Sequence, residues 1–338
     1  MKFRTEVAIR PSVNKIDQHC RLLSVGSCFA EEMTARLLQK GIPTLSNPLG
    51  TLYNPLSIER CIERLAEGCK IGVQDVECAG DRHFCYDTHG SFDSISAGAV
   101  VEGVNRAIEE GCHHLQRADW VVLTLGTAWV YEREGRVVAN CHKVPAREFL
   151  RRRLSLEEIV ESLRRTVSML GDRHIILTVS PIRHLGDGLD GNALSKSLLR
   201  VAASIVEEEW PNVSYFPAYE ILLDELRDYR FYADDMVHPS RVAVEYVWEQ
   251  FAAAYLSEEA KAVGVRFEKL AERLAHRPLH PESSAYALFR QAAKEDVLTL
   301  LELYPENDVA RRMAALCDEN EVRVAKMGKE SEKNRGER

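Results

Sequence analysis

Four short apolar segments, separated by longer segments with helical spacing, constrain the fold of this chain more than any other feature. The apolar segments cover residues 21–26, 120–125, 174–179 and 213–216. Apolar residues recur with helical spacing at residues 29–39, 56–67, 97–115, 155–170, 194–209 and 239–255. Strands that alternate with longer helices are typical of an α/β fold with a parallel sheet.

The segments between these elements carry weaker signals. Residues 42–55, rich in Pro, Asn and Gly, are expected to form a loop. Residues 130–138 predict a hairpin that turns at Glu134-Gly135. We interpret Arg151-Arg152-Arg153 as the solvated start of the next helix rather than as a nucleic-acid-binding patch.

The strand signals stop near residue 257, which predicts a change of architecture there. We expect an α/β domain over residues 1–256 and a helical extension over residues 257–320. Residues 321–338 are mostly charged or polar, so we expect a disordered tail.

Composition excludes several classes of protein. The chain has 338 residues, 45% of them hydrophobic, which is ample for a packed core. Its 44 Lys and Arg against 52 Asp and Glu give a formal net charge of -8. General nucleic-acid binders carry a basic face, so we expect no nucleic-acid partner.

The expected compartment is the cytoplasm. Residues 1–20 contain no apolar core of the signal-peptide type, and no stretch approaches the roughly 20 apolar residues of a membrane span. The 9 cysteines form no CxxC pair, which favours reduced thiols over a disulfide framework. None of these features predicts the oligomeric state.

Gly26-Ser27-Cys28 joins the first apolar segment to the first helical segment. A side chain at the carboxyl end of a parallel strand points into the crevice where ligands bind. The start of the following helix directs N–H groups and positive charge at the same point, which favours a thiolate and can stabilise an oxyanion. Cys28 is therefore a candidate nucleophile. The alternative is that it is a small buried apolar residue.

Asp235-Met236-Val237-His238 precedes the last helical segment of the α/β region. A carboxylate three residues before a histidine can hold one ring nitrogen, which leaves the other nitrogen free to face a nucleophile. Asp235 and His238 are thus a candidate orienting group and base. The alternative is a surface pair that only docks its loop.

Several further segments accompany these two motifs and carry a family resemblance. They are residues 24–30, 47–55, 124–129, 140–145, 180–184, 216–220 and 226–232. Residues 26–30 spell Gly-Ser-Cys-Phe-Ala, and over residues 21–251 the chain resembles the GSCFA family, which is similar to the SGNH, or GDSL-type, hydrolases. The resemblance implies a three-layer α/β/α domain with a parallel, flavodoxin-like sheet.

The resemblance also implies catalytic roles. The Gly-Asp-Ser block of SGNH hydrolases aligns with residues 26–28, so Cys28 takes the position of the nucleophile. His238 is then the base and Asp235 its partner. Ser27, adjacent to Cys28, is the alternative nucleophile.

The oxyanion hole departs from the SGNH pattern. The second block implies an N–H donor at Gly50, beside the N–H of Cys28. The third block should read Gly-x-Asn, but residues 126–128 read Gly-Thr-Ala. Losing one oxyanion donor costs about 10²–10³ in rate, and we expect Asn54 or Asn140 to replace it.

The remaining polar residues of these loops are expected to bind substrate. The candidates are Thr127, His142, Arg183 and His184. A solvated loop is the alternative for Arg183 and His184. Cys112-His113-His114 and Asn140-Cys141-His142 lack the paired spacing of zinc sites, so no metal site is expected.

The function expected from all of this is acyl chemistry. We expect an acyl-ester hydrolase or an O-acyltransferase that acts on a small polar substrate or a glycan. No bound cofactor is expected, and acyl-CoA is a candidate co-substrate for a transferase. The alternative is a binding module for a carbohydrate or a protein partner, with little or no catalysis on the same scaffold.

Overall fold

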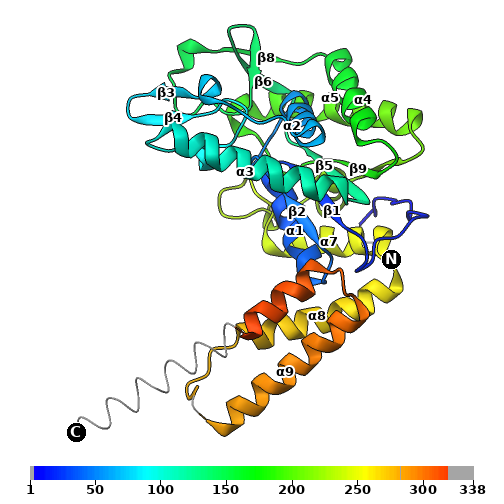
Figure 1. Ribbon diagram of the computed structural model, residues 1–338. Helices are drawn as coiled ribbons and strands as arrows, with labels where there is room; N and C mark the ends of the chain where they lie inside the picture. The colour runs from blue at the N-terminus through cyan, green and yellow to red at the C-terminus, as the bar shows by residue number, and fades with distance from the viewer. Residues whose placement is uncertain (1–3, 282, 319–338) are drawn as a thin grey trace. The chain divides into compact units, whose positions relative to one another are not determined.

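A computed structural model describes residues 4–281 and 283–318. Its centre is a five-stranded parallel sheet with the order β10-β9-β5-β1-β2 (Figure 1). Counted along the chain, this is the 2-1-3-4-5 order of flavodoxin-like folds. The strands are β1 (Leu22–Gly26), β2 (Thr44–Ser46), β5 (Trp120–Leu125), β9 (His174–Val179) and β10 (Val213–Phe216).

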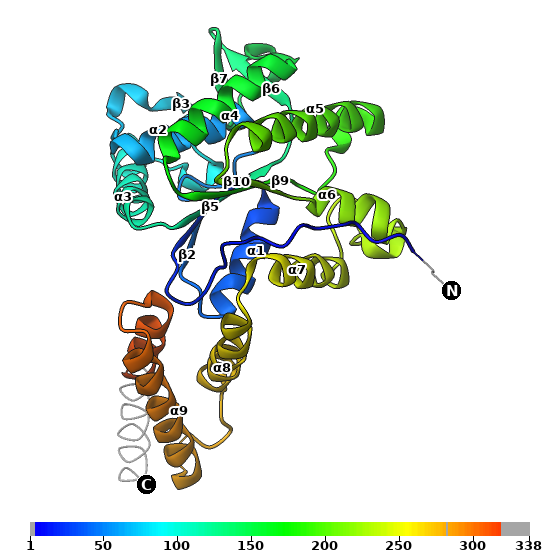
Figure 2. The same ribbon diagram turned by 90° about the vertical axis from the view of Figure 1, so that its right-hand side faces the viewer.

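Helices cover both faces of this sheet, so the predicted three-layer α/β/α fold is confirmed. Figure 2 shows α2 to α5 on one face and α1 and α7 on the other. The helices are α1 (Cys28–Gln39), α2 (Pro55–Glu67), α3 (Ala97–Gln116), α4 (Leu156–Leu170), α5 (Gly188–Glu209) and α7 (Arg241–Tyr255). Short helical turns also occur, namely α6 (Ala218–Glu220), η1 (Val73–Asp75), η2 (Gly90–Phe92), η3 (Ala146–Glu148), η4 (Leu185–Asp187), η5 (Ile221–Leu226) and η6 (Tyr229–Phe231).

Burial on both faces explains why most of the strands could be predicted. Every residue of β5 is buried. Leu123 and Leu125 belong to the core under α2 to α5, while Trp120 faces the other layer and packs against Tyr255 of α7. Parallel strands covered on both sides consist of continuous apolar residues, which is the pattern found in the sequence.

Two small antiparallel sheets lie outside the central one. The three-stranded sheet has the order β7-β6-β8, with β6 (Trp129–Arg133), β7 (Arg136–Val138) and β8 (Leu150–Arg153). The predicted hairpin turns at Glu134-Gly135, where both residues have positive φ. The two-stranded sheet pairs β3 (Glu77–Ala79) with β4 (Arg82–Phe84).

Two predictions of local structure are wrong. Arg151-Arg152-Arg153 does not begin a helix but forms most of β8, and Ser155 begins α4 by accepting a hydrogen bond from the N–H of Glu158. Residues 42–55, predicted as a loop, include the edge strand β2. In both places the strand is too short to show a pattern of its own.

A second unit consists of residues 14–20, 35–43 and the described residues from 256 onward. It holds α8 (Glu258–Ala275), α9 (Ser284–Leu303) and a helical segment at residues 308–318. Phe267, Val297 and Ala310 are part of its core. Asn307 donates hydrogen bonds to the carbonyls of Gln18 and Gly41, both at 2.8 Å. The tail predicted at residues 321–338 lies outside the described residues.

In the part of the chain that the structure describes, no helix combines the length and the apolar character needed to cross a membrane.

Gly26 closes β1 in a conformation that glycine alone accommodates. Its φ is +145°, and a Cβ added there would lie 2.2 Å from the carbonyl oxygen of Thr124 on β5. We expect Gly26→Ala to lower the free energy of unfolding by at least about 3 kcal/mol, because it adds backbone strain to a clash within the sheet. Urea unfolding followed by circular dichroism measures this loss.

Gly135 provides the matched control for this substitution. It also has positive φ, at +76°, but a Cβ there would meet no atom within 4 Å. Gly135→Ala should therefore cost only about 1 kcal/mol. Equal losses in the two variants would show that the contact with β5 is not what requires glycine at position 26.

Candidate active site

A cavity of about 720 Å³ opens at the carboxyl ends of β1, β5 and β9. Its walls come from the segments that directly follow these strands, including Cys28 after β1, Thr127 after β5 and Ile182 after β9. The sheet order reverses between β1 and β5, and ligands of open α/β sheets bind at such a switch point. The cavity therefore lies where the topology favours a functional site.

Cys28 and Ser27, adjacent at the start of α1, have different surroundings. Cys28 lines the cavity, whereas Ser27 is 1% exposed. The Ser27 hydroxyl has no hydrogen-bond partner among the described residues, and its N–H donates to the carbonyl of Thr124 at 3.1 Å. Of the two adjacent candidates, the thiol is therefore the one presented to a ligand.

The fold brings Cys28 next to His238 across 210 positions of sequence. The Cys28 Sγ lies 3.9 Å from Nε2 of the imidazole. The other ring nitrogen, Nδ1, lies 2.6 Å from Oδ2 of Asp235. Thiol, imidazole and carboxylate are therefore linked one to the next, with the thiol and the imidazole on the wall of the cavity.

Asp235 also shapes the loop that carries His238. Its Oδ1 accepts hydrogen bonds from the N–H groups of Val237 and His238, at 2.9 and 3.0 Å. These two N–H groups and the His238 ring lower the pKa of Asp235 to about 2. The carboxylate is therefore ionised at any physiological pH and holds the proton of the imidazole on Nδ1.

Arg183 supports the same loop from behind. Its guanidinium stacks 3.9 Å from the ring centre of Tyr232 and donates to the carbonyl of Met236 at 3.5 Å. Its own N–H donates to the carbonyl of Val237. Arg183 lines the cavity, as expected of a residue that binds substrate. Its guanidinium and its backbone N–H, however, donate to carbonyls of the His238 loop.

The environment of Cys28 favours the neutral thiol at rest. Burial raises its pKa and outweighs the backbone N–H groups of Cys28 and Phe29, which act in the opposite direction. The charge of Glu31 raises the pKa further. The helix start lowers the pKa of Cys28 as expected, but desolvation and a nearby carboxylate exceed its effect.

Gly50 does not supply the expected oxyanion donor. Its N–H donates to the carbonyl of Asn47 at 2.7 Å within a tight turn, and the residue is not part of the cavity wall. A Cβ on Gly50 would lie 2.2 Å from the Cβ of His89, which accounts for glycine at this position. The turn geometry corrects the role assigned from the resemblance.

The two asparagines proposed as replacement donors both line the cavity. Asn54 caps α2, with Oδ1 accepting from the N–H of Ser57 and Nδ2 donating to the Ser57 hydroxyl. The Oδ1 of Asn140 accepts from the N–H of His142 at 2.8 Å. Its Nδ2 has no hydrogen-bond partner among the described residues. Asn140 is therefore the better placed of the two to donate to a ligand.

The four residues expected to bind substrate have different environments. Thr127 lines the cavity, but its hydroxyl lies 3.1 Å from that of Ser195 and accepts from the N–H of Trp129. His184 also lines the cavity, 5.8 Å from Tyr53 between ring centres. Burial lowers the pKa of His184 to about 4, so the ring is neutral.

His142 is not part of the cavity wall, and its predicted role in substrate binding is wrong. Its side chain is fully buried and stacks on Phe84 with ring centres 4.5 Å apart. Nδ1 lies 2.8 Å from a carboxylate oxygen of Asp93. Burial lowers the pKa of this imidazole, which makes it a neutral part of the core.

Comparison with family models identifies the relatives of this chain. The model of the GSCFA family matches residues 21–251, more than half of the sequence. The chain belongs to the GSCFA family. A second model, GSCFA domain protein, C-terminal domain, matches residues 267–319. A search of curated proteins finds no significant match. The expected family is thus confirmed, and similarity to SGNH hydrolases stays a prediction.

Aromatic and charged side chains from β6, β8 and η4 form a further wall of the cavity in this GSCFA protein. The Arg151 guanidinium lies 4.5 Å from the ring centre of Trp129 and 5.6 Å from that of Tyr131. Arg151 also pairs with the carboxylate of Asp187. This wall was not predicted, because Arg151 was assigned to the solvated start of a helix rather than to β8.

Lys196 is a second residue of the GSCFA domain that sequence analysis missed. It is 1% exposed, and its Nζ donates to the carbonyls of Gly126 and Ser180 at 2.6 and 2.7 Å. A signal was available, because Lys196 lies three residues before Leu199 on the apolar stripe of α5. A lysine within such a stripe is unusual, since buried charges need partners.

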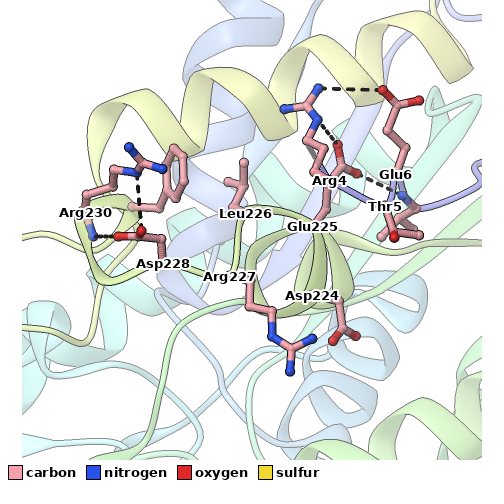
Figure 3. Close-up of a pocket in the computed structure, with 11 residues that line it drawn as sticks. Arg4, Thr5, Glu6, Asp224, Glu225, Leu226, Arg227, Asp228 and Arg230 are labelled. Atoms are coloured by element: carbon pink, nitrogen blue, oxygen red, sulfur yellow. Dashed lines mark hydrogen bonds and ion pairs between the residues drawn. The ribbon is translucent and has the colours of Figure 1, made fainter. Parts of the chain in front are cut away.

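A second hollow, of about 700 Å³, lies between residues 4–7 and residues 224–231, which run from η5 to η6 (Figure 3). Arg4 there lies between the carboxylates of Glu6 and Glu225, and Glu225 also accepts from the N–H of Val7 at 2.9 Å. No thiol or imidazole lines this hollow in the described part of the chain. The cavity at Cys28 is therefore the better candidate for chemistry.

Within residues 4–281 and 283–318, no three His, Cys, Asp or Glu side chains come together so that they could hold a metal ion.

Proposed function

We propose that this GSCFA protein is an acyl-ester hydrolase or O-acyltransferase with Cys28 as its nucleophile. The observation that carries the proposal is the contact between Cys28 and His238 on the wall of a cavity, with Asp235 bound to the other ring nitrogen, at separations of 3.9 and 2.6 Å. A nucleophile, a base within reach and a third group that orients the base are the signature of covalent acyl catalysis.

The proposed reaction starts from the neutral thiol. The S–H proton of Cys28 passes to Nε2 of His238 as the sulfur attacks the carbonyl carbon of an ester. The resulting oxyanion collapses to a thioester, and the leaving alcohol takes the proton from Nε2. Water or an acceptor hydroxyl then attacks the thioester and gives its proton to His238. The second oxyanion collapses to release the carboxylic acid or the new ester, and the sulfur takes the proton back from His238.

Donors for the oxyanion come from the start of α1. The N–H groups of Cys28 and Phe29 already favour negative charge at the sulfur, and backbone donors of this kind stabilise tetrahedral intermediates. Asn140 adds a side-chain amide whose Nδ2 has no hydrogen-bond partner among the described residues and can donate to a ligand. Together they take over the role of the asparagine that Gly126-Thr127-Ala128 lacks.

The size and lining of the cavity support a substrate larger than a simple ester. About 720 Å³ is far more than a short acyl group occupies and falls in the range of small-molecule sites. Trp129 and Tyr131 offer ring faces, and Arg151 and Asp187 offer charged hydrogen-bonding groups. We propose a polar acyl acceptor of glycan type, with acyl-CoA as a candidate donor if the reaction is a transfer.

Kinship with SGNH hydrolases is part of the same proposal. The flavodoxin-like strand order, a nucleophile directly after the first strand and a histidine just before α7 support it. A binding module remains the second candidate. It is favoured by the raised pKa of Cys28 and by the engaged amides of Gly50 and Asn54.

Acylation by an activated ester tests the proposal. The full chain is incubated with p-nitrophenyl acetate between pH 6 and 9, and the acetylated peptides are identified by mass spectrometry. We expect rapid acetylation of Cys28 that is lost in His238→Gln. Cys141 lines the same cavity without a histidine partner, so Cys141→Ala should be acetylated at Cys28 as fast as the wild type. Absence of acetyl-Cys28 at every pH would favour the binding module.

A further inference from the structure

Lys196 is a buried lysine next to the proposed nucleophile that the mechanism above does not use. Its Nζ lies between the carbonyl oxygens of Gly126 and Ser180. These are the first residues after β5 and β9. The amino group therefore joins the carboxyl ends of the two strands that form the floor of the cavity.

Neighbouring residues of α5 hold the same region. The Ser195 hydroxyl accepts from the N–H of Ala128 at 2.7 Å. Asn192 accepts from the N–H of His184 at 3.0 Å. With these contacts beside it and its own two hydrogen bonds, Lys196 has a defined position rather than a mobile side chain.

The sheet register places Lys196 close to the thiol. Gly26 of β1 is paired with Thr124 of β5, and the N–H of Ser27 donates to the carbonyl of Thr124. Cys28 and Gly126 each lie two residues beyond this pair on adjacent strands. The Gly126 carbonyl, which accepts from Lys196, and the candidate nucleophile Cys28 therefore leave the sheet side by side.

Among the titratable groups near Lys196 and Cys28, the amino group of Lys196 is a source of positive charge. Around Lys196 are Cys28, the neutral imidazole of His184 and the ring of Tyr219, whose centre is 5.9 Å from Nζ. Around the thiol are Tyr53, His238 and the carboxylate of Glu31, which disfavours a thiolate. Lys196 acts on Cys28 in the opposite direction to Glu31.

We propose that Lys196 is a positioning residue whose buried amino group supplies the positive charge that stabilises negative charge at Cys28. The proposal rests on Cys28 being the nucleophile. Burial lowers the pKa of Lys196 to about 7, and the thiolate of Cys28 raises it. Ionisation of the thiol thus favours the protonated lysine, whose charge is costly to bury without a nearby anion.

Alkylation of Cys28 by iodoacetamide tests this coupling without any substrate. The rate for the Cys28 peptide is followed by mass spectrometry between pH 6 and 11, because the reaction reports the thiolate. In Lys196→Met we expect the midpoint of the pH profile to rise by at least about one pH unit, which corresponds to an approximately tenfold slower alkylation at pH 8.

Leu199→Ala is the matched control for damage to α5. Leu199 is fully buried three residues further along the helix and carries no charge. This variant should lose stability but keep the wild-type midpoint. If Lys196→Met also kept the wild-type midpoint while losing stability, the role of Lys196 would be structural and the proposal would be wrong.

A second measurement covers the case in which Lys196→Met does not fold. Coupling is reciprocal, so a negative charge fixed at position 28 by Cys28→Asp should raise the pKa of the Lys196 amino group above its value in Cys28→Ser, as followed by NMR titration of lysine Nζ resonances. An unchanged lysine pKa would overturn the proposal. Neither readout requires turnover, so a failure to acylate Cys28 would refute the proposed function and leave this coupling to be decided separately.

Discussion

Cys28→Ala is expected to reduce the turnover of an activated acyl ester by at least about 10³-fold, because the thiol is the group proposed to form the covalent intermediate. Only the cavity and its oxyanion donors would remain. The measurement is the steady-state release of p-nitrophenol, together with the initial burst that marks an acyl-enzyme. The burst should vanish in the variant, while its melting temperature stays close to that of the wild type.

Ser27→Ala is the matched comparison, since it changes the adjacent residue. The Ser27 hydroxyl is buried and has no partner among the described residues, so removing it takes nothing from the cavity and leaves no donor or acceptor stranded. Turnover should stay within a few-fold of the wild type. The reverse pattern, with loss in Ser27→Ala and retention in Cys28→Ala, would assign the nucleophile to the serine.

Asp235→Asn should reduce turnover by about 10²–10³-fold through the tautomer of His238. The asparagine oxygen can still accept from the N–H groups of Val237 and His238, which now bond to Oδ1. Its amino group would then face Nδ1 of the imidazole, where Oδ2 is at present 2.6 Å away. A donor at that point moves the ring proton to Nε2, which can no longer accept the proton of Cys28.

The pH dependence separates this explanation from a collapse of the loop. Since the pKa of Asp235 is held near 2, its carboxylate stays ionised above about pH 4 and adds no acid limb to the wild-type profile. Its contribution to stability is likewise present above the usual carboxyl pKa and is lost only as the pH falls towards 2. His238→Gln should show a loss at least as large, and a wild-type rate in either variant would refute the proposed base.

Much of the fold could be predicted because burial leaves its pattern in the sequence. β1, β5 and β9 are covered on both faces, so each is a continuous apolar run. β2 and β8 were missed because one has three residues and the other consists largely of arginine. Their strand conformation depends on pairing with β1 and β6, a long-range interaction that no local pattern records.

The site shows the same division. Cys28, His238 and Asp235 could be proposed from short motifs because each needs only its own strand end or loop to be presented. The roles given to Gly50 and His142 failed on contacts made elsewhere, since the N–H of Gly50 bonds to Asn47 and the ring of His142 is buried on Phe84. Neither contact is visible in the residues that flank these positions.

The sequence by itself determined the layered α/β architecture, the family and the identity of the thiol, imidazole and carboxylate, because periodic burial and short motifs are local properties. Only the tertiary structure decided that the thiol faces the cavity while Ser27 does not, and that desolvation keeps it protonated. It also decided that Lys196 joins the strand ends beside it. Desolvation, charge and hydrogen-bond competition depend on which distant segments meet, and folding alone brings them together.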